Sequence, residues 1–175
     1  MHSEVKAKAS SVEQGLSRLI ATFDWKYSST PPKNGTPTWN VTIGDFSVPW
    51  NSETDRSLTA SQKRKYKHQA WAECDYTVDE IGSTFTIQGF DLNYAGVILG
   101  PSVIYRDGKI RFDPSKSANK NVTNKRTMLN KEKIDLSDQL MRNELNVLLT
   151  RGIHGLYVYA VDDELRHALS AKVHN

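Results

Sequence analysis

The sequence has a single cysteine, Cys74, among its 175 residues, so no disulfide can form within the chain. This cysteine usage is typical of a reducing compartment. The sequence also lacks an apolar run long enough to cross a membrane, and its N-terminus lacks the apolar core of a signal peptide. We therefore expect a cytoplasmic protein without a membrane partner.

The composition is that of an ordinary globular domain, with 38% hydrophobic and 25% charged residues. A chain of this length can bury a substantial core, and we predict a single domain over residues 1–175. The net charge of +3 and the pI near 8.9 permit an anionic partner without requiring one.

The clearest pattern lies near the C-terminal end. Apolar residues at helical spacing predict a helix that begins near Ser137. The run over 156–161 is continuously apolar and predicts a buried parallel strand. Thr150, Arg151 and Gly152 form a polar turn between them. An arginine suits phosphate oxygens, but a cation is also favourable at a helix C-terminus, so both interpretations of Arg151 stay open.

Other elements follow from local patterns and turn residues. We predict a helix over 10–20, a strand over 39–46, a loop over 49–51, a helix opening near Thr59 or Ser61, short strands over 83–87 and 95–99, a hairpin over 103–112 with a type I′ turn at Asp107-Gly108, and a final helix from Asp162 through Leu169. Residues 113–135 are polar and basic. They fit either a mobile excursion or a surface that contacts a phosphate backbone.

Several side chains have both a functional and a plain structural interpretation. The tryptophans could stack on nucleobases, although such residues more often pack in cores: Trp25, Trp39, Trp50 and Trp71. A basic cluster could follow a nucleic-acid backbone, although a solvated helix face is commoner: Lys63, Arg64, Lys65 and Lys67. Scattered aspartates could bind the metal of a nuclease, but no spacing links them: Asp45, Asp91, Asp107 and Asp113.

The stretch between the two predicted strands fits an α/β nucleotide-binding layout, in which a polar turn follows a strand. Gly89 would let the backbone approach a ligand closely, and Asp91 could accept a hydrogen bond from a ribose hydroxyl. A simple turn explains the same pattern.

Two stretches together resemble helicase motifs. Residues 86–101, Thr-Ile-Gln-Gly-Phe-Asp-Leu-Asn-Tyr-Ala-Gly-Val-Ile-Leu-Gly-Pro, resemble motif V of superfamily 1 helicases, and 147–152, Val-Leu-Leu-Thr-Arg-Gly, resemble motif VI. Further matches stand in order: Ile-Gly-Asp-Phe at 43–46, Pro-Trp-Asn at 49–51, Tyr-Arg-Asp-Gly at 105–108 and Asp-Pro-Ser-Lys at 113–116. The series is similar to the Schlafen-group-like DNA/RNA helicase domain family, from about Leu19 to Leu169.

The resemblance implies a three-layer α/β/α RecA-like domain with a mostly parallel sheet, a β-hairpin and a basic loop excursion over 113–135. Such a domain would be the second, C-terminal one of a two-domain motor that acts on DNA or RNA. ATP and Mg would be bound mainly by the N-terminal RecA-like domain of the same full-length chain. The present sequence has no Gly-x-x-x-x-Gly-Lys-(Ser/Thr) loop. We therefore expect a fragment of a longer chain that is inactive as an ATPase alone.

Residue by residue, the resemblance implies that Arg151 is the motif VI arginine finger, which stabilises charge in phosphoryl transfer. It implies a nucleotide contact and coupling role for Gln88, Gly89 and Asp91, and a positioning role for Thr150. Asp91 stands where the wider superfamily usually has Glu. We expect the site at the carboxyl ends of the strands, where Gly89 and Arg151 converge.

The resemblance also implies contacts with nucleic acid from Thr84, Thr86, Lys116 and Lys120, and it implies no protein metal ligand in this chain. Phe85 departs from the pattern, since the family often has His there for a contact with the nucleic-acid backbone. An alternative function is a stand-alone basic module that binds nucleic acid through 63–67 and 116–133 without catalysis. Such a module predicts steeply salt-dependent binding.

Overall fold

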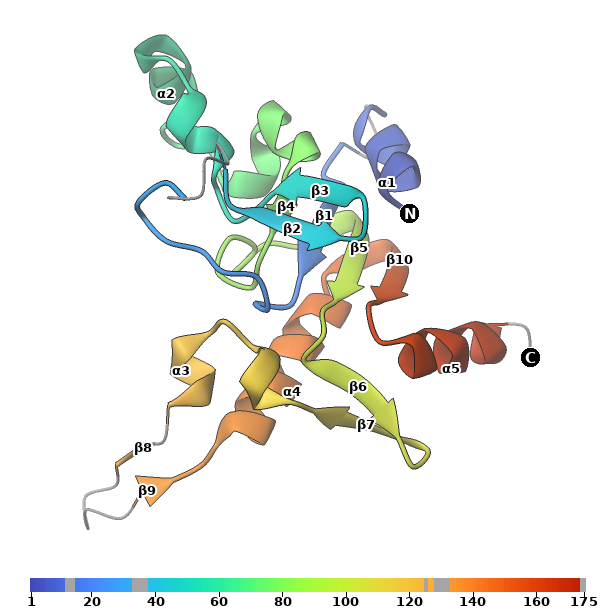
Figure 1. Ribbon diagram of the computed structural model, residues 1–175. Helices are drawn as coiled ribbons and strands as arrows, with labels where there is room; N and C mark the ends of the chain where they lie inside the picture. Colours follow the sequence, from blue (N-terminus) through green and yellow to red (C-terminus); the bar gives the residue numbers. More distant parts are fainter. Residues whose placement is uncertain (12–14, 33–37, 125, 128–132, 174–175) are drawn as a thin grey trace.

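The computed structural model describes residues 1–11, 15–32, 38–124, 126–127 and 133–173. At its centre lies a four-stranded, all-parallel sheet with the strand order β10-β5-β1-β4 (Figure 1). Its strands are β1 (Arg18–Ala21), β4 (Ile81–Gly82), β5 (Leu92–Leu99) and β10 (Gly152–Ala160).

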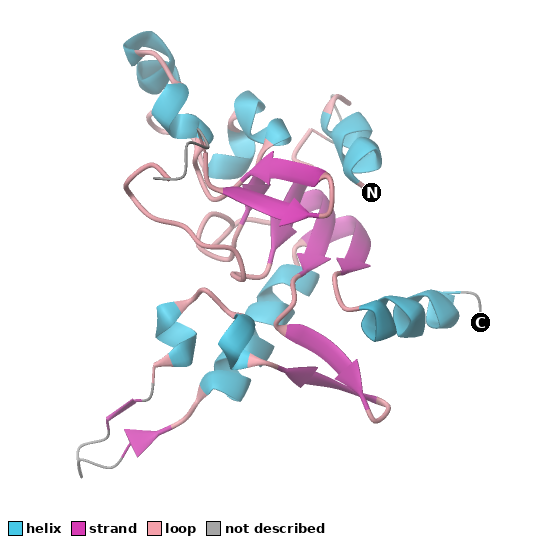
Figure 2. Ribbon diagram, in the orientation of Figure 1, coloured by secondary structure: helices cyan, strands magenta, loops and turns pink. Residues whose placement is uncertain are grey.

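Helices and small antiparallel hairpins surround this sheet (Figure 2). The α-helices are α1 (His2–Ala9), α2 (Ala60–Tyr66), α3 (Lys120–Thr123), α4 (Ser137–Leu149) and α5 (Asp163–Val173). The 3-10 helices are η1 (Thr54–Ser57), η2 (Trp71–Glu73), η3 (Asp75–Asp79) and η4 (Pro114–Lys116). The hairpins are β2 (Asn40–Ile43) with β3 (Phe46–Pro49), β6 (Val103–Arg106) with β7 (Lys109–Phe112), and β8 (Arg126–Thr127) with β9 (Lys133–Ile134).

Alternate residues of the strands face two separate cores. On one face, Ala95 and Val97 pack with Leu148 of α4 and Leu165 of α5. On the other face, the partners include α1 and the β2–β3 hairpin; the buried members of that core are Val5, Leu19, Ala21, Val41, Val48, Trp50, Ile81 and Ile98. The predicted three-layer α/β/α class is thus confirmed, with a hairpin completing one outer layer.

The strand order places a topological switch point between β1 and β5. The connection from β1 to β4 contains the β2–β3 hairpin, which packs on one face, whereas the connection from β5 to β10 contains α4 on the other face. In open α/β sheets, ligands commonly bind outside the carboxyl ends of the strands at such a point. The carboxyl ends of β1 and β5 at this switch point are therefore a candidate position for a ligand.

The predicted helix over 10–20 is wrong. The helix ends at Ala9, and Arg18–Ala21 is the central strand, with all four residues buried; residues 12–14 of the prediction lie outside the described chain. Four consecutive buried residues in a doubly covered strand show no alternation, so spacing alone cannot distinguish them from a helix face. The buried Arg18 is held by Thr77 Oγ1 at 2.8 Å and the Cys74 carbonyl at 3.0 Å.

Two further predictions near the sheet need correction. The predicted strand over 83–87 is a turn, because β4 ends at Gly82 and Thr86 bonds back to Ser83. The predicted loop over 49–51 is partly wrong, since Pro49 belongs to β3 and Trp50 forms a parallel bridge to Ile81.

The predicted parallel strand after Arg151 is confirmed, but it is longer than expected and is not continuously buried. β10 lies at the edge of the sheet, and Ile153, Leu156 and Val158 are exposed. The edge position leaves one side of the strand without a neighbour among the described strands. This explains the exposure of side chains that the apolar pattern alone would place in a core.

Most local predictions are confirmed. The β6–β7 hairpin turns at Asp107 and Gly108, which both have positive φ. α4 begins at Ser137, and α2 begins after Thr59, whose side chain caps it. The predicted strand over 39–46 is β2, but Phe46 begins the next strand. The described part of 113–135 carries η4, α3, β8 and β9; residues 125 and 128–132 of that prediction lie outside the described chain.

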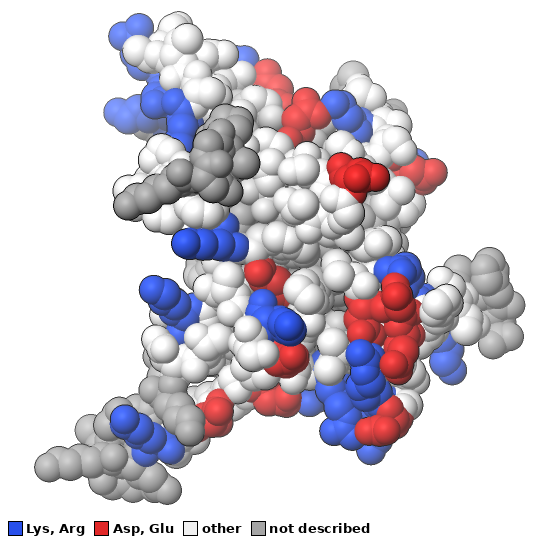
Figure 3. Space-filling model, viewed as in Figure 1, with Lys and Arg blue, Asp and Glu red and all other residues white. Residues whose placement is uncertain are grey.

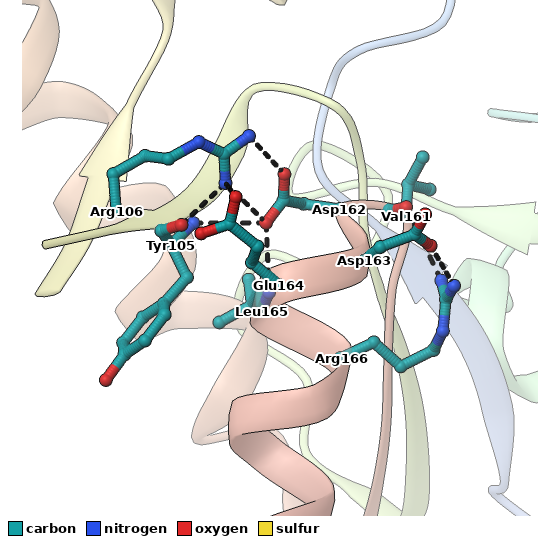
Figure 4. A network of polar contacts seen from close by, with 8 residues as sticks. All are labelled: Tyr105, Arg106, Val161, Asp162, Asp163, Glu164, Leu165 and Arg166. Carbon is teal, nitrogen blue, oxygen red and sulfur yellow. Dashed lines mark hydrogen bonds and ion pairs between the residues drawn. The ribbon is translucent and has the colours of Figure 1, made fainter. Parts of the chain in front are cut away.

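A polar network fastens the β6–β7 hairpin to the start of α5 (Figure 4). Asp162 pairs with Arg106 through both oxygens, at 3.1 and 2.9 Å, and accepts from the backbone N–H groups of Tyr105 and Leu165. The guanidinium holds the pKa of Asp162 below its usual range. Asp162 therefore both caps α5 and anchors the hairpin, which agrees with the predicted helix start at this residue.

Among the described residues, no helix is long and apolar enough to cross a membrane.

Candidate nucleotide and nucleic-acid site

Arg151 lies at the amino end of the sheet, between α4 and β10. Its Nη1 atom lies 3.2 Å from Asp91 Oδ1 and donates to the Phe90 carbonyl at 3.2 Å. Its Nε atom donates at 3.0 Å to the carbonyl of Val147 in the last turn of α4. The Leu92 N–H donates to the Arg151 carbonyl at 2.7 Å. The guanidinium thus joins the end of α4 to the turn before β5.

The surroundings of Arg151 accommodate both interpretations of this residue. Its bond to the Val147 carbonyl is the interaction of a cation with a helix C-terminus. Its side chain is nevertheless 22% exposed, and its partner Asp91 is 58% exposed. An ion pair this open to water contributes about 0–1 kcal/mol, so Arg151 could exchange Asp91 for another anion at small cost.

The other residues of the predicted nucleotide site lie beside this pair. Thr150 ends α4, and its hydroxyl donates to the Asn146 carbonyl at 2.8 Å. Gln88 and Gly89 occupy an exposed turn before Asp91. Gly89 has a φ of +78°, and a Cβ there would meet nothing within 4 Å, so the backbone conformation, not lack of space, favours glycine.

The prediction joined Gly89 to Arg151; the contacts of Arg151 with this turn are instead to Asp91 and to the carbonyl of Phe90, and the predicted edge of the sheet is wrong. Arg151 directly precedes β10 and Asp91 directly precedes β5, so both lie at the amino ends of these parallel strands. The reason is that both motifs run from a helix or turn into a strand. The general rule for α/β sheets concerns residues that follow strands.

The segment 83–90 leads from the carboxyl end of β4 to the amino end of β5. It begins with a tight turn, in which Thr86 Oγ1 accepts from the Ser83 N–H at 2.8 Å and the Ile87 N–H donates to the Ser83 carbonyl. Ile87 is fully buried in the core beneath α4. Thr84 and Thr86 therefore lie at the carboxyl edge, whereas Gln88 and Gly89 lie toward Arg151.

Asn51 anchors the start of this segment, a role that local sequence patterns do not indicate. Its Oδ1 accepts from the Ser83 hydroxyl at 2.6 Å, and its N–H donates to the Ile81 carbonyl at 2.9 Å. Asn51 and Ser52 both have positive φ, at 61° and 69°. Two consecutive non-glycine residues in this conformation are strained. The only signal for Asn51 in the sequence is the Pro-Trp-Asn match in the ordered motif series.

At the carboxyl edge, an aromatic pair meets the basic segment. Phe85 makes an edge-to-face contact with Phe23 at 5.4 Å between ring centroids. The Phe23 carbonyl accepts from the Ala118 N–H at 2.9 Å and from the Ser117 hydroxyl at 3.3 Å. Lys116 and Lys120, which flank these two residues in the chain, are exposed. Thr84 and Thr86 are thus chain neighbours of Phe85, and the segment that carries Lys116 and Lys120 is bonded to its ring partner Phe23.

Three acidic side chains of the domain have a pKa raised by desolvation. Burial raises the pKa of Glu144 on α4 to about 7; its Oε1 accepts from the Phe23 N–H at 2.8 Å. Burial likewise raises the pKa of Asp24, which accepts from the Ser102 N–H at 2.8 Å. Glu80, which accepts from the Trp71 indole N–H at 3.1 Å, also has its pKa raised to about 7 by burial. These groups hold backbone and indole donors in place.

The tryptophans favour the packing interpretation. Trp50 is fully buried, and the other three are half-buried with their indole N–H groups bonded: Trp25 to the Thr42 carbonyl, Trp39 to the Thr30 carbonyl and Trp71 to Glu80.

The aspartates considered for a nuclease lie on different elements: Asp45 in the β2–β3 turn, Asp91 beside Arg151, Asp107 in the β6–β7 turn and Asp113 before η4. In the part of the chain that the structure describes, no group of three or more His, Cys, Asp or Glu side chains could hold a metal ion.

Basic side chains gather in several places on the face shown in Figure 3, over α2, over the β6–β7 hairpin and around the middle of the view between β2–β3 and α3. On α2 and just after it, Lys63, Arg64 and Lys67 are exposed, and Lys65 pairs with Asp75 at 3.2 Å. Acidic residues interrupt the patch on the hairpin, where Asp107 pairs with Arg111 at 3.0 Å. The positive charge is therefore dispersed and includes the carboxyl edge.

The structure is that of a three-layer α/β/α domain in which segment 83–90 joins two ends of a parallel sheet. Over residues 1–162, the chain matches the family described as Schlafen group 3, DNA/RNA helicase domain, and it belongs to that family. It is 40% identical over 174 residues to the uncharacterised protein YPL245W of Saccharomyces cerevisiae. That match covers 97% of this chain but 34% of the yeast protein, so the chain spans about a third of its relative. No solved structure matches the chain.

Proposed function

We propose that this chain is the second RecA-like domain of an ATP-dependent DNA/RNA helicase or translocase of superfamily 1. In this role it contributes the motif VI arginine finger, Arg151, and the motif V turn of Gln88, Gly89 and Asp91. ATP and Mg are bound mainly by an N-terminal RecA-like domain of the same full-length protein. The single observation that supports this function best is the meeting of Arg151 with Asp91 from stretches that are distant in sequence.

The chemistry assigned to Arg151 is stabilisation of the negative charge that develops on the γ-phosphate. In the resting chain the guanidinium is paired with Asp91, and that pair is open enough to water to be exchanged. When ATP is bound between the two domains, the phosphate takes the place of Asp91 as the partner of Arg151. Asp91 is then free to accept a hydrogen bond from the ribose.

The segment 83–90 supports the coupling part of the proposal. It is one short stretch whose middle is fixed in the core by Ile87 and whose ends lie at the carboxyl and amino edges of the sheet. A contact with nucleic acid at Thr84 or Thr86 and a contact with nucleotide at Gln88 or Gly89 would therefore act on the same rigid turn. Lys116 and Lys120 add charge at the nucleic-acid end.

The test is ATP turnover by the full-length protein with Arg151→Ala. We expect turnover to fall by about 10³-fold or more while nucleotide binding is retained, as for loss of an arginine finger. Arg142→Ala is the control, because Arg142 is an exposed arginine on the neighbouring helix α4 and its pair with Asp138 is long, at 3.5 Å. Turnover that survives Arg151→Ala would contradict the proposal.

A stand-alone nucleic-acid-binding module without catalysis is the second candidate, supported by the exposed basic side chains on and after α2. It predicts strongly salt-dependent binding by a full-length protein that has no ATPase activity. The same ATP turnover measurement on the wild-type protein separates the two candidates.

A further inference from the structure

We propose that Phe85 is a stacking platform for one nucleobase of a single-stranded nucleic acid that crosses the carboxyl edge of β1 and β4. This inference rests on the proposed function, because it assigns the way in which that nucleic acid is held. It adds a role to a position where the chain departs from the residue its family often has.

Phe85 is an apolar ring presented to water by a rigid turn. The residue is 52% exposed, and among the described residues it is the one aromatic in the group of exposed large hydrophobic side chains. Its backbone N–H donates to Ser83 Oγ at 3.2 Å, and Ser83 is in turn bonded to Asn51. Little conformational entropy remains to be lost when a base settles on the ring, so the ring is pre-organised for stacking.

Aromatic residues support the ring from behind. Phe85 meets Phe23 at an interplanar angle of 85°, and Phe23 packs at 5.0 Å against Trp50, which is fully buried. The column fixes the position of Phe85 without covering it. A ring needed only for the core would be expected to lie in the column's interior, as Trp50 does.

The surroundings favour a nucleic acid over an apolar protein partner. Lys116 and Lys120 are exposed, and no described carboxylate pairs with either; Lys26 is also exposed, with its Nζ atom 5.3 Å from the ring centroid of Trp39. Lys26 follows Phe23 by three residues, and the other two flank the Ser117–Ala118 stretch bonded to the Phe23 carbonyl. A single exposed ring is too small for a stable protein interface, whereas one base can stack on it while the flanking phosphates meet the lysines of the neighbouring segments.

The location agrees with the topology. The ring lies beside the residues that follow β1 and β4, next to the switch point between β1 and β5. It lies at the opposite end of segment 83–90 from Arg151, so a base on Phe85 would leave the proposed nucleotide site open.

The experiment measures binding of the 175-residue chain to a single-stranded oligothymidylate and to an abasic strand of the same length and charge, at several salt concentrations. Phe85→Ala should weaken binding to oligothymidylate by roughly 5- to 150-fold, the range for loss of one aromatic–base stack, and leave the salt slope unchanged. The wild type and Phe85→Ala should bind the abasic strand with equal affinity. Phe85→Trp should retain the affinity of the wild type.

Two controls make the test specific. Ile110→Ala removes another large exposed apolar side chain, 46% exposed on β7, and should change nothing. The double change of Lys116 and Lys120 to Ala should lower the salt slope by about 1.4, as expected for two phosphate contacts with a single strand. Thermal unfolding of each variant shows whether its fold is retained.

Equal binding of oligothymidylate by the wild type and Phe85→Ala would overturn the stacking role while leaving the proposed function intact. Failure of the wild-type chain to bind either strand would overturn the nucleic-acid role as well. Repeating the comparison with oligouridylate should give the same ratio of wild-type to Phe85→Ala affinity, because stacking does not depend on the sugar. A loss of affinity with only one of the two strands would contradict a stack.

Discussion

Replacing Glu144 with glutamine should make the protein less sensitive to rising pH. Glu144 is half-buried on α4, and desolvation of its carboxyl raises the pKa from an ordinary 4.5 to about 7, with the nearby Asp24 adding to the rise. Between these two values the native state holds a proton that the unfolded state has released. Stability therefore falls as pH rises from 4.5 to 7, and the full penalty is present above pH 7.

The gap between the two pKa values corresponds to about 3 kcal/mol. The amide of a glutamine remains neutral at every pH and can still accept the Phe23 N–H through its oxygen. Going from pH 5 to pH 8, the wild-type protein should thus lose about 2–3 kcal/mol more unfolding free energy than Glu144→Gln does.

Urea unfolding of both proteins at pH 5 and pH 8 measures this difference directly. Any fixed cost of the amide cancels, because each protein is compared with itself. Glu80→Gln is the control, since Glu80 accepts through both oxygens, from the Thr54 N–H and the Trp71 indole, and a glutamine NH₂ would face one of these donors. Because the pKa of Glu80 is also raised to about 7, that variant should lose part of the same pH dependence and should in addition be destabilised at pH 5. An identical pH dependence of the wild type and Glu144→Gln would refute the assignment of a desolvated, protonated Glu144.

Two other changes test the structure. Asp162→Ala should lower the unfolding free energy by about 1–2 kcal/mol, because the cap of α5 and the ion pair with Arg106 are both lost. Asp162→Asn should lower it less, because an asparagine can still cap the helix. The lowered pKa of Asp162 means that its charge stabilises the wild-type fold above its ordinary pKa and less as pH falls, so the difference in unfolding free energy between the wild type and either variant should shrink in urea titrations at acid pH. Gly152→Ala should destabilise by about 1–3 kcal/mol in thermal unfolding, since its Cβ would lie 2.3 Å from the Gly155 carbonyl oxygen; an unchanged midpoint would contradict the close backbone approach at the start of β10.

Elements whose formation depends on local chemistry could be predicted from the sequence. The Asp107-Gly108 turn requires positive φ, α2 carries its own Thr59 cap, and α4 shows a regular apolar face. Each of these signals lies within a few neighbouring residues, so no knowledge of the rest of the fold is needed.

Elements whose state depends on distant partners could not be predicted. Arg18–Ala21 is a strand because β4 and β5 flank it, and Leu156 is exposed because β10 lies at the edge. The same holds for the site: the resemblance predicted that Arg151 would meet the turn at Gly89, which is next to its actual partner Asp91 in the chain, whereas the contact of Asn51 with Ser83 joins residues far apart in the chain and was not predicted.

The position of β1 has a consequence for the order of folding. Its four residues occupy the interior of the sheet, yet Arg18 pairs with Ala95 and Leu19 with Ile81, far along the chain. During synthesis this strand has no sheet partner until the two-residue strand β4 and then β5 have emerged, and the edge strand β10 joins last. Non-local parallel pairing forms slowly, because the entropy cost of closing the long loops comes before the stabilising contacts are made. Chains that end before Leu92 should therefore contain α1 and the β2–β3 hairpin but no stable central sheet.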